Sequence, residues 1–184
     1  MSAATSATGQ VAITVTGYET PPSSLIASIQ PLTQSVGITL SFTNNSSGSG
    51  TCDLLYTTTG SLASTTTTLN FNSGLKSPFN ESLVFARIRC LIIQNNNTAT
   101  LGQDLQVYQG ASNGVIWVGA TSGSPDLITS GIGGAIGGIR VWYDGQGTGA
   151  TTGMYITSSH CNLTLNSGSN TISYTVLAFG NSVA

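Results

Sequence analysis

Alternation of apolar and polar residues runs through most of the chain, and a period of two predicts β-strands. In residues 10–17, QVAITVTG, the apolar residues Val11, Ile13 and Val15 fall on one side of the expected strand and threonines fall on the other. Residues 37–43, GITLSFT, repeat the pattern. Both segments are therefore predicted to be strands with one apolar side.

The longest predicted strand spans residues 82–94, SLVFARIRCLIIQ. One of its sides is wholly apolar and is assigned to the core: Val84, Ala86, Ile88, Cys90 and Ile92. The opposite side carries Leu83, Phe85, Arg87, Arg89, Leu91 and Ile93. Phe85, Arg87 and Arg89 are candidate subunit-interface residues, because Arg beside aromatic and aliphatic side chains is enriched at interfaces. The alternatives are arginines that snorkel from a solvated sheet and a small basic stripe for nucleic acid, for which two charges are few.

Turn residues separate the apolar segments at short intervals, and no segment has the periodicity of an amphipathic helix. Residues 161–166 and 171–179 flank the turn sequence SGSN and are predicted to close the chain as a hairpin. About ten to twelve such strands predict an all-β fold with little or no helix. We expect one antiparallel β-sandwich of jelly-roll type, with about 8–12 strands, over residues 1–184. Residues 1–10 are expected to form an N-terminal arm held by contacts with other subunits, since polar chain ends are ordered mainly where contacts hold them.

Charge is scarce in this composition. Four Lys or Arg and six Asp or Glu residues make up 5% of the chain, against roughly 25% in an average soluble domain. The net charge of −2 gives no electrostatic footprint for nucleic acid. A surface with so few charges tends to associate, so we expect neighbouring copies to cover part of it. No apolar run is long enough to span a membrane, and the N-terminal sequence lacks the basic and apolar regions of a signal peptide.

A glycine-rich stretch, GIGGAIGG at residues 131–138, raises the question of a phosphate-binding loop. Such a loop must open a helix, whereas the residues that follow, IRVWYDG, predict a strand. The acidic partner for a ribose and the lysine of a P-loop are also missing. The stretch is therefore interpreted as a loop at one end of the sandwich, with Ile132 and Ile136 as candidate contacts to the next subunit.

Catalytic chemistry is poorly represented. His160, the only histidine, precedes Cys161, but neighbours on a strand face opposite sides, and Cys161 shares the expected core side with Leu163 and Leu165. The six carboxylates are scattered singly and are interpreted as turn formers or caps. We predict that the protein is not an enzyme and holds no metal or cofactor.

Three cysteines, Cys52, Cys90 and Cys161, allow at most one internal disulfide and show no CxxC spacing. They are interpreted as buried thiols, and a disulfide among them is left open. Trp117 and Trp142 suggest an alternative use of the fold, stacking on sugars, although aromatic residues in apolar strands are more often part of a core.

The second half of the chain carries a characteristic order of segments. FARIRCLIIQNNNTATLGQDLQVYQG is an apolar strand, an Asn-rich turn and a short strand; GGIRVWYDG and LTLNSGSNTISYTVLAFG follow. Over about residues 83–180 this order resembles small all-β virion proteins of tailed or related bacterial viruses, with jelly-roll-like capsid, decoration or spike domains. The chain departs from many jelly-roll coat proteins because it lacks a basic N-terminal arm, which puts genome binding in doubt.

The resemblance implies a structural virion protein, assembled in the host cytoplasm, whose partners are copies of itself and other virion proteins. No membrane partner is expected. The alternative is an extracellular β-sandwich, either a glycan-binding or adhesin-like module or a subunit of a filament or surface layer.

Overall fold

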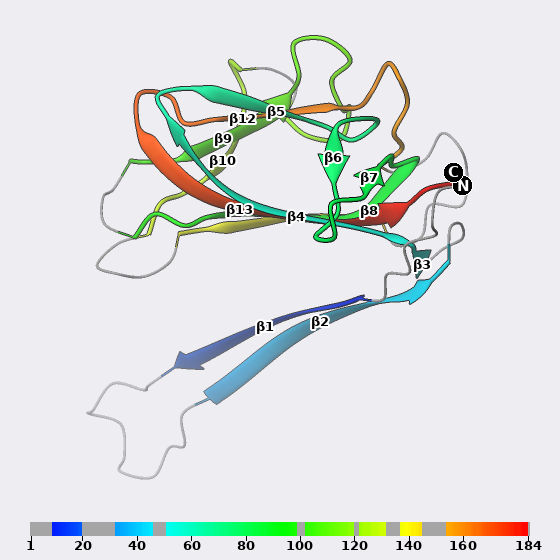
Figure 1. The fold of residues 1–184 in the computed structure, drawn as a ribbon. Helices are drawn as coiled ribbons and strands as arrows, with labels where there is room; N and C mark the ends of the chain where they lie inside the picture. The colour runs from blue at the N-terminus through cyan, green and yellow to red at the C-terminus, as the bar shows by residue number, and fades with distance from the viewer. Residues whose placement is uncertain are drawn as a thin grey trace, which may run out of the picture.

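A computed structural model of the chain describes residues 9–19, 32–45, 51–98, 102–119, 122–131, 137–144 and 154–183. This described part contains strands and loops and no helix (Figure 1), which confirms the predicted all-β class. The strands are β1 (Gly9–Glu19), β2 (Leu32–Asn44), β3 (Thr51–Cys52), β4 (Leu54–Ala63), β5 (Thr66–Asn70), β6 (Leu75–Lys76), β7 (Ser82–Leu83), β8 (Arg87–Asn95), β9 (Leu105–Gln109), β10 (Asp126–Ile128), β11 (Ile139–Tyr143), β12 (Asn162–Asn166) and β13 (Thr171–Asn181).

Eight of these strands form two antiparallel sheets of four, ordered β11-β8-β13-β4 and β10-β9-β12-β5. Numbered one to eight along the chain, they lie in the orders 6-3-8-1 and 5-4-7-2. This is the arrangement of an eight-stranded jelly roll, in which two Greek keys build two facing sheets. Figure 1 shows the two sheets as stacked layers. β6 and β7 pair separately as a short hairpin.

The predicted closing hairpin is wrong, because β12 and β13 lie in different sheets. β12 pairs with β5, and β13 pairs with β4. Two corners therefore pass from one sheet to the other side by side. Ser64 donates from its backbone N–H to the Asn170 carbonyl at 2.9 Å, and the Ser167 hydroxyl donates to the Thr65 carbonyl at 3.2 Å. Local turn residues alone do not separate such a crossing from a hairpin.

The core lies between the facing sides of the two sheets. Fully buried aliphatic residues from both sheets meet there: Leu91, Ile93, Ile172 and Val176 from one, and Leu105, Val107, Leu163 and Leu165 from the other. Cys161 belongs to the same cluster, while His160 is exposed. The predicted core side of β12 is therefore confirmed.

The predicted strand at residues 82–94 is divided into β7 and β8 by residues 84–86. The chain turns inward here, because the Phe85 N–H donates to the Phe71 carbonyl and the Ala86 N–H donates to the Asn181 carbonyl. A β-bulge follows: Phe179 pairs with Cys90 and Gly180 pairs with Ile88, so Arg89 has no opposite residue on β13.

The bend and the bulge overturn the predicted faces of this segment. Leu83, Phe85, Leu91 and Ile93 lie in the core, together with Ile88, whereas Val84 is half exposed. Cys90 and Ile92 belong to a second apolar cluster on the outer side of the sheet. A strict alternation over the whole segment assigned most of these residues to the wrong side.

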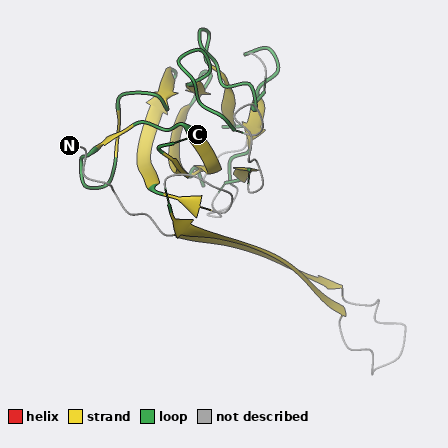
Figure 2. Cartoon of the chain, turned by 90° about the vertical axis from the view of Figure 1, so that its right-hand side faces the viewer, coloured by secondary structure: helices red, strands yellow, loops and turns green. Residues whose placement is uncertain are grey.

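β1 and β2 form a long two-stranded ribbon outside the sandwich. They pair antiparallel over the full length of β1, and the end of β2 pairs with β3. Figures 1 and 2 show the ribbon leaving the sandwich near β3 and extending away from both sheets. Gly9 and Gln10 of the predicted N-terminal arm begin β1, and residues 1–8 lie outside the described residues.

Candidate functional site

The outer side of the sheet β11-β8-β13-β4 carries an apolar surface that crosses all four strands. We call it the apolar outer face: Leu55, Cys90, Ile92, Ile139, Val141, Tyr143, Leu177 and Phe179. The strand pairing aligns Phe179 with Leu55 and with Cys90. At its β11 edge, Ile139 and Tyr143 are 59% and 47% exposed. The surface is thus buried at its centre and open at its edge within the described structure.

The corresponding side of the other sheet is polar. The strand pairing aligns Thr66, Asn166 and Gln106 in one row and Thr68, Thr164 and Tyr108 in the next. The Asn166 side-chain amide donates to the Gln106 side-chain oxygen at 3.0 Å. Leu127 in the edge strand β10 is the large exposed aliphatic residue aligned with this face. One side of the sandwich therefore suits water, and the opposite side has an apolar centre.

Two cysteines form part of the apolar outer face and its margin. Cys52 of β3 packs with Cys90 and Phe179, and all three side chains are buried. Burial raises the pKa of the Cys90 thiol to about 11, and burial together with the Asp53 charge raises the pKa of Cys52 to about 11. Burial also raises the pKa of Cys161. No disulfide joins any two of the three cysteines, and at neutral pH they are thiols, the unreactive form.

The base of the ribbon is fixed to the sandwich by a buried polar network around Asn181. The Asn181 side-chain amide donates to the carbonyls of Asn45 and Thr51, at 3.0 and 3.2 Å. Its side-chain oxygen accepts a hydrogen bond from Nε of Arg89 at 2.7 Å. Both partners are almost fully buried. Asn181, the last residue of β13, therefore joins the bulge of β8 to Asn45, which follows β2, and to Thr51, which begins β3.

The arginines predicted at a subunit interface are internal. Arg87 and Arg89 are each 2% exposed, and Phe85 packs in the core with its ring edge-on to Phe71, 5.9 Å between centroids. The Arg87 guanidinium carbon lies 6.0 Å from the centroid of the Tyr155 ring. Burial and then the charge of Arg87 lower the pKa of Arg89. Phe85, Arg87 and Arg89 are thus not part of the outer surface of the chain, and the predicted interface role is wrong for them.

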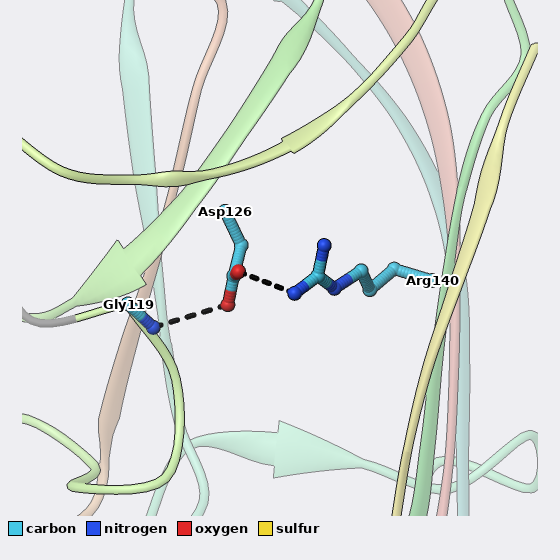
Figure 3. Close-up of polar contacts among 3 residues, drawn as sticks. All are labelled: Gly119, Asp126 and Arg140. Atoms are coloured by element: carbon cyan, nitrogen blue, oxygen red, sulfur yellow. Dashed lines mark hydrogen bonds and ion pairs between the residues drawn. The ribbon is translucent and has the colours of Figure 1, made fainter.

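Polar contacts join the two sheets at the edge formed by β10 and β11 (Figure 3). Nη2 of Arg140 lies 2.6 Å from Oδ1 of Asp126, and the Gly119 N–H donates to the other carboxylate oxygen at 3.1 Å. The Arg140 guanidinium carbon also lies 5.7 Å from the centroid of the Trp142 ring. This contact fixes the edges of the facing sheets relative to each other.

Close packing explains two glycines of the 131–138 stretch. A Cβ on Gly137 would lie 2.5 Å from the Asn95 carbonyl oxygen and 2.7 Å from that of Thr129. The Gly138 N–H donates to the Thr129 carbonyl, and β11 begins at the next residue, which confirms the predicted strand. Ile132 and Ile136 lie outside the described residues, so their predicted contact with a neighbouring subunit stays a prediction.

Four of the six carboxylates accept backbone hydrogen bonds, three of them in loops, as predicted for turn formers or caps, and Asp126 at the first residue of β10. Asp53 accepts from the Ser182 N–H, Asp104 from Ser130, Asp126 from Gly119 and Asp144 from Met154. In the described residues no group of three or more His, Cys, Asp or Glu side chains is placed to hold a metal ion. Nor does this part of the chain contain a helix long and apolar enough to cross a membrane.

Both tryptophans considered for stacking on sugars pack against the main core. Trp117 lies 6.4 Å, ring centroid to ring centroid, from Phe71. Trp142 packs on the same cluster from β11. Their rings are therefore partly buried.

The sequence reasoning missed the apolar outer face, although a signal for it was present. Residues 176–179 of β13, VLAF, and residues 90–93 of β8, CLII, are apolar at every position. A strand that is buried on both sides gives such a continuous run, whereas a half-buried strand alternates.

Comparisons with models of known protein families, with curated proteins and with solved structures found no match to this chain. The fold and the surface therefore define a class, an all-β jelly-roll domain with an extended ribbon, and no family.

Proposed function

We propose that this chain is a non-enzymatic structural protein that assembles with copies of itself into, or onto, the shell of a bacterial virus. One observation carries the proposal: the sheet β11-β8-β13-β4 carries the apolar outer face on part of its outer side, in addition to the core on its inner side. Apolar surface gains free energy when another surface covers it, by about 25 cal/mol per Å². Association that covers this surface is thus favoured over the monomeric state.

The low charge of the chain supports the same function. Ten charged residues in 184 leave little electrostatic repulsion between copies. Two of the four basic residues, Arg87 and Arg89, are internal, and Arg140 is paired with Asp126. Genome binding through a basic surface is therefore disfavoured, and a role in the shell, its decoration or an appendage is favoured. The location that follows is the virion, assembled in the host cytoplasm.

The experiment is the assembly state of the purified full-length protein, measured by size-exclusion chromatography with light scattering and by electron microscopy of negatively stained samples. The proposal predicts closed particles or regular oligomers at micromolar concentrations. A Leu177→Gln variant should shift the population to monomer, because it places an amide on the apolar outer face. The matched control is Tyr108→Gln on the polar side of the sandwich, which should assemble normally. A stable monomer that does not associate at any accessible concentration would overturn the proposal.

A further inference from the structure

The register of the ribbon formed by β1 and β2 gathers apolar positions on one of its two faces. Its register places Val11 opposite Leu40, Ile13 opposite Ile38, and Val15 opposite Val36. Directly opposite residues of an antiparallel pair share one face, so six apolar positions share one face of the ribbon. The adjacent pairs, which share the other face, consist mostly of Thr, Ser, Gln and Gly, for example Thr16 opposite Ser35.

Within the described part of the chain, no second sheet covers the ribbon. Among the described strands, β1 has its extensive contacts with β2, and β2 has its own with β1 and β3. Figures 1 and 2 both show the pair extending away from the sandwich. An isolated two-stranded hairpin is at best marginally stable in water, and it gains stability by packing on another layer.

Charge restricts what that layer can be. Residues 9–45 contain a single side chain that is charged at neutral pH, that of Glu19, and no Lys or Arg. Nucleic acid and anionic lipid both require basic side chains, so they do not suit the ribbon. An uncharged apolar surface does suit it, and the same chain displays one in the apolar outer face.

We infer that the ribbon of one copy packs on the apolar outer face of a second copy, and this rests on the self-association proposed above. The hydrogen bonds of Asn181 hold the base of the ribbon at the end of β13. From there the ribbon extends away from the sheet β11-β8-β13-β4 of the same chain (Figure 2). Reciprocal exchange about a two-fold axis covers both apolar outer faces with two identical ribbons.

The area of such an exchange is sufficient for a stable pair. Eleven residues at about 3.3 Å each and two strands about 4.8 Å apart give a ribbon face of roughly 350 Å². Two reciprocal contacts that cover this whole face, including Gly17 and Glu19 beyond the three apolar pairs, hide up to about 1,400 Å² in total, which reaches the range of about 1,200–2,000 Å² for specific interfaces.

The test uses the full-length chain in two forms. In the first, Ile13→Ser and Ile38→Ser are combined, which removes one apolar pair from the ribbon. The control combines Ala12→Ser and Thr39→Ser, the adjacent register pair on the other face. We expect the first variant to raise the dissociation constant at least about 10-fold and the control to leave it within about two-fold. Thermal unfolding of the dilute variants checks that the sandwich still folds.

In the second form, a chain with Ile13→Cys is mixed with a differently tagged chain with Leu177→Cys and oxidised. A disulfide between the two chains, identified by mass spectrometry of the linked peptides, is the expected result. A disulfide that forms within a monomer carrying both substitutions, and not between mixed chains, would overturn the exchange. Association that continues unchanged in the Ile13→Ser, Ile38→Ser variant would also overturn it while leaving the proposed function standing. A protein that is monomeric throughout would remove both.

Discussion

The two sheets of the sandwich have the same number of strands and share one core, yet their outer sides differ. In the sheet β10-β9-β12-β5 the outward rows are Thr, Asn, Gln and Tyr with one edge leucine. In the sheet β11-β8-β13-β4 the two outward rows next to β3 are mostly apolar: Leu55, Phe179, Cys90 and Tyr143 in one, and Thr57, Leu177, Ile92 and Val141 in the other. A sheet that faces water needs only one apolar side. Of the two sheets, β11-β8-β13-β4 is thus the one with apolar clusters on both of its sides, as expected of a middle layer.

The buried polar network strengthens this contrast. Arg89 and Asn181 belong to the sheet with the apolar outer side, and they hold the base of the ribbon. The polar sheet has surface amide pairs such as Asn166 with Gln106 instead. The sheet with the apolar outer side thus also holds the base of the ribbon, whereas the other sheet carries polar side chains on its outer side.

The largest effect is expected in the shared core. Leu165→Ala removes a fully buried side chain of β12 and should lower the free energy of unfolding by about 2–5 kcal/mol. Leu177→Ala on the apolar outer face should cost less than about 2 kcal/mol in the monomer, because its side chain is only partly buried, and should weaken association instead. Urea denaturation at low concentration measures the first effect and light scattering measures the second. Equal losses of monomer stability would remove the distinction between the inner and outer sides.

The network at the ribbon base comes next. Asn181→Ala removes the acceptor for the buried Nε of Arg89 and the donor to Asn45 and Thr51, and should cost about 2–4 kcal/mol. Asn166→Ala on the polar sheet is the matched control, at no more than about 1 kcal/mol. Urea denaturation of both variants decides the point. A control as costly as Asn181→Ala would show that the network around Asn181 is no more important for stability than a surface amide pair.

Alkaline pH is expected to destabilise the fold through two buried cysteines, Cys90 of the apolar outer face and Cys52 at its margin. Cys52 and Cys90 have a pKa of about 11 in the folded chain against an ordinary value of 9.0. Above pH 9 the unfolded chain loses these protons while the folded chain keeps them, so the free energy of unfolding falls as the pH rises from 9 to 11. Each group contributes roughly 1–2 kcal/mol of this loss. Below pH 9 both states keep the proton, so the free energy of unfolding does not depend on pH through these thiols.

Denaturation curves at pH 8, 9, 10 and 11 measure that slope, and Cys90→Ala should flatten it. An unchanged slope in this variant would show that the Cys90 thiol is not buried in the folded chain.

The smallest effect is expected at the edge where the two sheets meet. Asp126→Asn breaks the ion pair with Arg140 while keeping an oxygen that can accept from the Gly119 N–H. The side chain of Arg140 is 47% exposed, so the loss should be below about 1 kcal/mol and should shrink further in 1 M salt. A double-mutant cycle with Arg140→Met isolates the pair. A coupling of several kcal/mol would mean that the edge is shielded from water.

Local patterns were sufficient for the class of the fold and for part of the core. Alternation placed Cys161, Leu163 and Leu165 on the core side of β12, and the structure agrees. It failed at residues 82–94, because a bend at residues 84–86 and a bulge at Arg89 shift the alternation, and both depend on hydrogen bonds to distant residues.

The candidate site was harder to predict for the same reason. The contacts of Asn181 join residues about 130 positions apart in the chain, and no local spacing encodes them. The apolar outer face did leave a signal, the continuous apolar runs of β8 and β13, but such a run does not say which of the two sides lies inside.

Hydroxyl-radical footprinting of the full-length protein measures whether the apolar outer face is covered when copies associate. It compares side-chain oxidation in dilute, dissociated protein with that in concentrated, associated protein. We expect Ile139, Val141 and Leu177 to become protected on association, while Tyr108 and Leu127 on the other sheet stay oxidised at the same rate. Equal protection of both sheets, or protection of the polar side alone, would contradict this expectation.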